Sequence, residues 1–319
     1  MNQGSSSKGS AWGNEELETR QLGEDGPQVP VICLGAWPLG GGMGEIPDRQ
    51  AVDTIQASID AGGTFIDTAE GYRTSESVLG KALKGRRDQV FLATKLTGSH
   101  SAEHMASAIE NSLRSLGTEY VDLYQLHEPR PEYPIEETMA GLLKLRDEGK
   151  IRYIGVSNFS AAQHTEALEY GPVHSSQPRY NMFWRGIEKD LLPTCLKRRI
   201  GVIVHSPLAK GMLTGKYRPG HVFARDDERK EKPEFESEPF RRAFPIVEKL
   251  VEWAADHGRD GAQLAIAWTL AHPAVTSSIV GAKTAGQALD NISAADWRLS
   301  SDDMAEIDDI LGGYQFDGA

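Results

Sequence analysis

The chain has few cysteines, fewer basic than acidic residues, and no long apolar run. Its two cysteines, Cys33 and Cys195, lie far apart without metal-ligand spacing, so the sequence supports neither a disulfide nor a cysteine metal site. A reducing cytoplasm is then the default location. The 34 Lys and Arg against 46 Asp and Glu give a formal net charge of -12, which argues against a general nucleic-acid or anionic-membrane surface. Since no run reaches about eighteen apolar residues, no transmembrane helix is expected.

The composition is that of an ordinary globular protein, with 39% hydrophobic and 25% charged residues. A length of 319 residues suits one large α/β barrel or two smaller domains. Residues 1–16 lack the apolar core of a signal peptide and are typical of a disordered Ser/Gly tail. We therefore expect a single folded domain over residues 17–319.

Strand-like and helical segments alternate regularly along this domain. Two short β-like runs around a GEDGP turn predict a hairpin over residues 17–34. Eight apolar strand-like runs lie at residues 31–37, 64–69, 90–95, 121–127, 151–158, 175–181, 201–206 and 277–282. Helical segments are predicted at residues 48–61, 74–84, 101–116, 136–148, 161–169, 187–199, 239–257 and 261–271. This alternation predicts an α/β fold of the (β/α)8 TIM-barrel type.

A doubly wound sheet is the alternative fold. Its dinucleotide fingerprint G-x-G-x-x-G is missing, because the glycine run LGGGMG over residues 39–44 does not fit that spacing. Residues 218–238 are highly charged and contain two prolines, which is typical of a solvated surface loop. On a barrel, this loop leaves from the carboxyl face and could instead fold over a ligand as a lid.

Polar side chains end three of the predicted strands, where parallel α/β folds carry their chemistry. Asp67 ends the second strand with Tyr72 in the following loop, Lys95 ends the third, and His127 ends the fourth. A buried lysine needs a counter-ion, which Asp67 can supply. We expect the cation to lower the pKa of Tyr72 and make it a better proton donor. His127 can orient a carbonyl oxygen or share the proton. Taken singly, each residue also has a structural explanation. Asp67 could cap the following turn, Lys95 could be a snorkelling strand end, and His127 could be a core histidine with satisfied hydrogen bonds.

From about Leu17 to its end, the chain resembles the aldo-keto reductases. The resemblance is carried by the segments FIDTAEGY, TSESVLGKAL, FLATKL, VDLYQLHEP, IRYIGVSNF, HSPLAKGMLTGKY and IVGAKTAGQALDN, and it is strongest to the aryl-alcohol dehydrogenase-like and channel β-subunit-like branch. It implies a barrel closed at the bottom by its amino-terminal hairpin. It also implies reversible NADPH-dependent reduction of a small aldehyde or ketone. The tetrad it implies is Asp67, Tyr72, Lys95 and His127, with Tyr72 as general acid.

The resemblance also implies an NADPH site. Ser157, Asn158 and Gln177 match positions that hold the nicotinamide carboxamide, and side-chain amides and hydroxyls suit that group. Lys283 matches a basic residue on the ribose 2′-phosphate, which favours NADPH over NADH. The other cofactor residues that it implies are Trp37, His205, Ser206, Pro207, Leu208, Gly211, Leu213, Lys216, Gly281, Gln287, Asp290 and Asn291.

Some positions depart from the family pattern. His205 stands where an aromatic residue usually stacks on the nicotinamide, and a protonated imidazole would repel the oxidised ring. Glu128, next to the catalytic histidine, could raise the pKa of His127, touch the substrate or face water. Trp37 and Trp184 are expected to wall the substrate pocket. No metal site is expected, because the only close histidine pair is not H-E-x-x-H and lacks a third ligand.

An alternative from another functional class is an NADPH-binding, redox-sensing regulatory subunit related to the potassium-channel β subunits. The segment QPRYNMFWR resembles theirs, but those relatives have asparagine where this chain has His127. An unrelated barrel hydrolase is a third possibility. The sequence identifies neither the substrate nor whether the chain acts as a monomer or a homo-oligomer.

Overall fold

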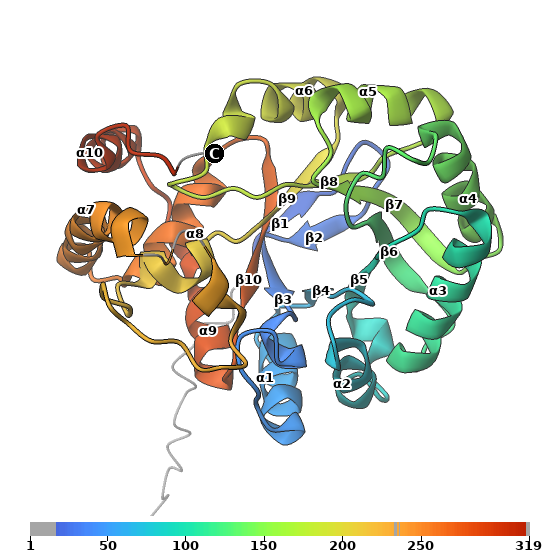
Figure 1. The fold of residues 1–319 in the computed structure, drawn as a ribbon, viewed down its shortest axis with the longest axis horizontal. Helices are drawn as coiled ribbons and strands as arrows, with labels where there is room; N and C mark the ends of the chain where they lie inside the picture. The colour runs from blue at the N-terminus through green and yellow to red at the C-terminus, as the bar shows by residue number, and fades with distance from the viewer. Residues whose placement is uncertain (1–16, 233–234, 236, 317–319) are drawn as a thin grey trace, which may run out of the picture.

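Eight parallel strands close into a barrel in the computed structural model, which describes residues 17–232, 235 and 237–316. The chain order around the barrel is β10-β3-β4-β5-β6-β7-β8-β9. Figure 1 shows the helices as a ring around these strands, with the orange β10 returning beside the blue β3. The predicted (β/α)8 barrel is confirmed. The predicted tail, residues 1–16, lies outside the described residues.

The strands of the barrel are short and almost wholly buried, as parallel strands covered by helices on their outer face must be. Their bounds are β3 Ile32–Gly35, β4 Phe65–Asp67, β5 Phe91–Leu96, β6 Val121–Leu126, β7 Ile151–Ser157, β8 Ser175–Gln177, β9 Gly201–His205 and β10 Val275–Gly281.

Ten helices are seen in the described part of the chain, and side-chain caps begin several of them. Their bounds are α1 Asp48–Asp60, α2 Ser75–Ala82, α3 Ala102–Leu116, α4 Ile135–Asp147, α5 Ala161–Tyr170, α6 Leu191–Arg198, α7 Ser237–Asp256, α8 Gly261–Ala271, α9 Ala285–Ser293 and α10 Ser301–Leu311. Ser160 with Gln163, and Asp260 with Gln263, form capping boxes that start α5 and α8. None of the described helices is both long and apolar enough to cross a membrane.

The amino-terminal hairpin closes the bottom of the barrel. Its strands β1 (Thr19–Gln21) and β2 (Gln28–Pro30) pair antiparallel. Leu22 and Val29 are fully buried in one cluster with barrel-lining side chains of β3 to β6, β9 and β10. Ser277 Oγ donates a 2.8 Å hydrogen bond to the Pro30 carbonyl and ties the hairpin to β10. Because this end is plugged, the carboxyl ends of the strands form the open face.

The predicted element bounds are wrong in a few places, each for a local reason. The run 175–181 is a strand only to Gln177, because Pro178 has no N–H for the ladder. The helix predicted at 187–199 is a 3₁₀ turn, Gly186–Glu188, followed by α6, whose first amide is capped by Asp190. No predicted segment covers helix α10, although Ser300 and Asp303 form a capping box at its start.

Gly155 on β7 shows how tightly the barrel interior is filled. A Cβ at this position would lie 2.2 Å from Ser175 Oγ and 2.9 Å from Gln125 Cγ. Gly155→Ala should lower the free energy of unfolding by about 1–3 kcal/mol through overpacking, as measured by urea titration. Gly286→Ala, whose Cβ would meet only Thr284 Oγ1 at 3.9 Å, is the matched control and should leave stability equal or higher. Equal stability of wild type and Gly155→Ala would contradict this packing.

Candidate active site

A lysine–aspartate pair is buried at the open end of the barrel. Asp67 is the last residue of β4, and Lys95 is the penultimate residue of the neighbouring β5. The Lys95 side chain is fully buried, and its Nζ lies 2.5 Å from Asp67 Oδ1. The other carboxylate oxygen accepts hydrogen bonds from Gln125 Nε2 at 2.9 Å and Gln177 Nε2 at 3.0 Å. Both carboxylate oxygens therefore have partners, as a buried charge requires.

The Lys95 ammonium also reaches the phenol of Tyr72. Its Nζ donates to the Thr68 carbonyl at 2.9 Å and to Tyr72 Oη at 3.2 Å, so all three of its hydrogens have acceptors. Burial alone would lower the pKa of Lys95, but Asp67 and Tyr72 raise it above its ordinary value, so the amine stays charged. Because Tyr72 Oη accepts from Lys95, its own hydrogen can be donated into the cavity.

The protonation state of Tyr72 differs from the expectation. Burial raises the pKa of Tyr72, and Lys95 only partly offsets this. The prediction that Lys95 brings the pKa below its ordinary value is therefore wrong, because burial penalises the phenolate more than the cation favours it. Tyr72 is consequently protonated at neutral pH and holds the hydrogen that a proton donor needs.

His127 follows β6 directly and lies beside Tyr72, with 5.5 Å between ring centroids. Its Nδ1 lies 3.1 Å from Thr97 Oγ1. Burial and the charge of Lys95 lower the pKa of His127 to about 3, so the ring is neutral at neutral pH. The suggestion that Glu128 raises this pKa is wrong, since Glu128 is exposed and burial dominates.

These groups border a cavity of about 1200 Å³, which extends from the tetrad to the start of α9. Asp67, Tyr72 and His127 line it, while Lys95 lies behind them and reaches the cavity through the Tyr72 hydroxyl. The other predicted residues that line it are Trp37, Glu128, Ser157, Asn158, Gln177, Trp184, His205, Ser206, Pro207, Leu208, Gly211, Lys216, Gly281, Lys283, Gln287, Asp290 and Asn291.

Leu213 is the one predicted cofactor residue that the structure places elsewhere. It is buried in the hydrophobic core rather than at the cavity. The reason is the 3₁₀ turn η4 (Ala209–Thr214), in which Lys210 and Gly211 adopt left-handed backbone angles. This turn keeps Gly211 at the cavity and directs Leu213 into the protein.

A chain of hydrogen bonds sets the tautomer of the neutral His205 ring. Asn158 Nδ2 donates to the His127 carbonyl at 3.1 Å, so its Oδ1 faces His205 Nε2 at 3.3 Å and requires a hydrogen there. His205 Nδ1 then accepts from Ser206 Oγ at 3.0 Å. Burial, with the nearby charges of Arg179 and Lys95, lowers the pKa of His205 to about 3. The like-charge conflict with an oxidised nicotinamide therefore does not arise at neutral pH.

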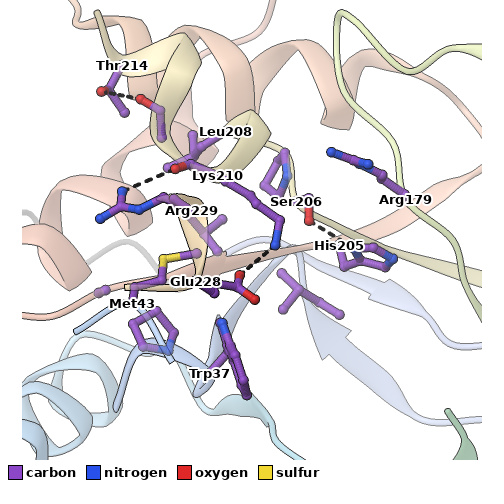
Figure 2. Close-up of a pocket in the computed structure, with 18 of the residues that line it drawn as sticks. Trp37, Met43, Arg179, His205, Ser206, Leu208, Lys210, Thr214, Glu228 and Arg229 are labelled. Atoms are coloured by element: carbon purple, nitrogen blue, oxygen red, sulfur yellow. Dashed lines mark hydrogen bonds and ion pairs between the residues drawn. The ribbon is translucent and has the colours of Figure 1, made fainter. Parts of the chain in front are cut away.

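The charged loop predicted at 218–238 folds against the cavity rather than away from it. Glu228, in the 3₁₀ turn η5 (Glu228–Glu231), forms a 2.5 Å ion pair with Lys210. Figure 2 shows the two side chains meeting above Trp37. Arg229 donates to the Lys210 carbonyl at 3.3 Å and lines the same cavity. Of the two interpretations of this loop, a solvated surface loop or a lid over a ligand, its position against the cavity favours the lid. Residues 233, 234 and 236 of the loop lie outside the described residues.

The glycine run before α1 packs around the site. A Cβ on Gly42 would lie 2.0 Å from Trp37 Cε2, so the indole occupies the space that a side chain would need. The indole in turn lies 4.8 Å from the Tyr72 ring, edge-on at 66°. Lys283 donates its Nζ hydrogen to the Met43 carbonyl at the end of this run. The glycines thus allow a loop to approach Tyr72 and the end of β10 closely.

A second wall of the cavity is aromatic. Trp184 stacks on Phe316, with 4.5 Å between centroids, and the Arg179 guanidinium lies 3.4 Å from the Trp184 ring centroid. Sequence reasoning found Trp184 but missed Arg179 and Phe316. It likewise missed Met43, Lys210, Glu228 and Arg229, which belong to loops without periodicity. Of these residues, Lys210 is the easiest to find from the sequence, because it falls inside the segment HSPLAKGMLTGKY that carries the family resemblance.

A model of one protein family covers most of the chain. The model of the Aldo/keto reductase family matches residues 31–311. The chain belongs to the aldo/keto reductase family. It is thereby assigned to a family of oxidoreductases that act on small carbonyl compounds. The assignment to the aryl-alcohol dehydrogenase-like and channel β-subunit-like branch stays a prediction.

Individual relatives cover almost the whole chain. Aldo-keto reductase YhdN of Bacillus subtilis is 38% identical over 92% of this chain and 94% of its own. The glycerol dehydrogenase of Gluconobacter oxydans superposes with a TM-score of 0.84 at 33% identity, over 94% of this chain and 98% of its own. An aldo/keto reductase of Klebsiella pneumoniae, solved with NADP and acetate, gives a TM-score of 0.76 at 33% identity, over 91% and 94% of the two chains.

The depressed pKa of His205 has a consequence for stability. Because its pKa falls from 6.5 to about 3 on folding, the unfolded chain binds a proton there that the native chain does not, and this contribution to stability is lost as pH falls from about 6.5 towards 3. His205→Phe removes the titrating group and keeps a flat ring. Between pH 7 and pH 4 it should lose less free energy of unfolding than wild type, as measured by urea titration.

The matched control is His221→Phe, which makes the same change at an exposed position outside the cavity. Parallel pH dependences for wild type and His205→Phe would show that His205 does not titrate as described.

Proposed function

We propose that this protein is an NADPH-dependent reductase of aldehydes or ketones, acting reversibly through Tyr72 as general acid and base. The observation that carries the proposal is the Lys95 ammonium, 2.5 Å from Asp67 and 3.2 Å from the phenol of Tyr72, at the edge of a cavity of about 1200 Å³. That volume exceeds the roughly 300–1000 Å³ usual for one small ligand, and it accommodates a dinucleotide together with a substrate.

Tyr72 and His127 are suited to a carbonyl oxygen. Tyr72 keeps its proton until it is transferred, and the neutral imidazole of His127 can donate a hydrogen bond to the same oxygen. Lys95 lies where negative charge appears on Tyr72 after proton transfer, so it stabilises the phenolate when it forms. In the reverse direction the same phenolate accepts the proton of the alcohol.

The cavity residues fit a nicotinamide dinucleotide in the chemistry of their donors and acceptors. Gln177 uses its amide hydrogens on Asp67 and Gln125, which leaves its oxygen to accept from a carboxamide. Asn158 and Ser157 stand beside it. When bound, the reduced cofactor supplies a hydride to the carbonyl carbon. We expect the His205 ring to support the nicotinamide face.

The far end of the cavity suits phosphates. Lys210, Lys216, Arg229 and Lys283 line it, and such cations are ordinary partners of pyrophosphate and of a ribose 2′-phosphate. The relative from Klebsiella pneumoniae solved with NADP supports the choice of NADPH. The regulatory-subunit alternative is not favoured, because the cavity holds both proton-handling groups of a reductase.

Replacing Tyr72 with Phe removes the proton donor and retains the ring. Tyr72→Phe should lower kcat for aldehyde reduction by about 10²–10⁴-fold, followed at the cofactor absorbance band over a panel of aldehydes, ketones and sugars with NADPH and with NADH. NADPH should still quench tryptophan fluorescence, because Trp37 and the cofactor contacts are unchanged. Tyr170→Phe, at an exposed position on α5, is the control and should keep wild-type activity. Unchanged turnover in Tyr72→Phe would defeat the mechanism.

A further inference from the structure

Thr97 is the residue through which three parts of the site meet. It follows the last residue of β5, two positions after Lys95. Its Oγ1 lies 3.1 Å from His127 Nδ1. Within the described part of the chain, Thr97 is the only hydrogen-bond partner of the His127 ring.

The backbone of Thr97 is fixed on both sides. Its N–H donates to Glu70 Oε1 at 2.5 Å, and its carbonyl lies 3.0 Å from His104 Nε2. Burial raises the pKa of Glu70, although this hydrogen bond from Thr97 opposes the shift. Glu70 lies two residues before Tyr72, so the loop that carries the proton donor is tied to Thr97.

The side chain of Thr97 is also restricted. A Cβ on Gly71 would lie 3.1 Å from Thr97 Oγ1 and 3.3 Å from its Cγ2, so the threonine already fills the space next to Gly71. A threonine has few accessible rotamers, because its Cβ is branched. The hydroxyl is therefore held against the histidine ring.

The direction of the hydrogen bond decides what His127 can do. A neutral imidazole carries one hydrogen, either on Nδ1 or on Nε2. If Thr97 donates to Nδ1, the hydrogen lies on Nε2, the nitrogen left for the cavity. If Thr97 instead accepts from Nδ1, then Nε2 presents a lone pair and repels a carbonyl oxygen. Among the described residues, Oγ1 has no other acceptor for its hydrogen than Nδ1.

We propose that Thr97 is a positioning residue whose hydroxyl donates to Nδ1 of His127 and thereby fixes the imidazole hydrogen on Nε2, facing the substrate. The histidine then works as a neutral hydrogen-bond donor to the carbonyl oxygen, beside the proton donor Tyr72. The catalytic consequence rests on the proposed function, whereas the tautomer of His127 is independent of it.

The tautomer can be measured without turnover. In ¹⁵N-labelled protein, long-range ¹H–¹⁵N correlation spectra distinguish the protonated ring nitrogen, and the His127→Asn spectrum assigns the signal. Wild type and Thr97→Ser, which keeps the hydroxyl, should show His127 protonated on Nε2. Thr97→Val keeps the shape but loses the donor, and should shift His127 towards the Nδ1 form. A wild-type His127 protonated on Nδ1 would overturn the proposal without any variant.

Kinetics supply the second readout. Thr97→Val should lower kcat/KM for carbonyl reduction about tenfold while its affinity for NADPH, from fluorescence quenching, stays within twofold of wild type. Thr97→Ser should restore most of the loss. Thr165→Val is the matched control, since among the described residues the Thr165 hydroxyl bonds only to the Ala161 carbonyl of its own helix.

The outcomes separate the two proposals. A loss of activity in Thr97→Val without a change of tautomer, or without rescue by serine, would overturn the positioning role. A tautomer shift in a protein whose wild type reduces no carbonyl compound with NADPH or NADH would support the role of Thr97 and reject the proposed function.

Discussion

The structure depends on a charged lysine kept inside the barrel by an aspartate. Burying an ammonium and a carboxylate costs several kcal/mol each unless geometry and further hydrogen bonds offset the loss of water. Here all three hydrogens of Lys95 and both oxygens of Asp67 have partners, two of them the amides of Gln125 and Gln177. This requires the ends of β4, β5, β6 and β8 to converge, which a closed barrel achieves.

From this pair, the rest of the site is built outward. Lys95 uses its last hydrogen on Tyr72, which leaves the hydrogen of the phenol for the cavity. Burial, with the charge of Lys95, lowers the pKa of His127, so the ring stays neutral and is a hydrogen-bond donor rather than an acid. Burial thus sets the protonation of both neighbours, while Lys95 opposes its effect on the pKa of Tyr72 and adds to its effect on the pKa of His127. Glu70 and Thr97 link the loops that carry these neighbours.

The strands could be predicted, and with them Asp67, Lys95 and His127, because a polar residue at the end of an apolar strand interrupts the local hydrophobic pattern. Barrel topology then brings such strand ends together. Other features depend on distances that sequence does not contain. The pKa of Tyr72 is decided by its burial, which exceeds the effect of Lys95. Leu213 lies in the core because two left-handed residues redirect its turn. Arg179 and Glu228 reach the cavity from irregular segments, whereas the start of α10 carries a capping signal that the sequence does contain.

The account is tested most directly by following the hydride in a protein that lacks the buried cation. Wild type and Lys95→Met would be given an aldehyde and NADPH carrying deuterium at both C4 positions, and the alcohol analysed by mass spectrometry. We predict one deuterium on the carbonyl carbon with wild type. We predict almost none with Lys95→Met, although the variant still binds NADPH. Equal deuteration by both proteins, or none by wild type with any aldehyde or ketone of the panel, would contradict the account.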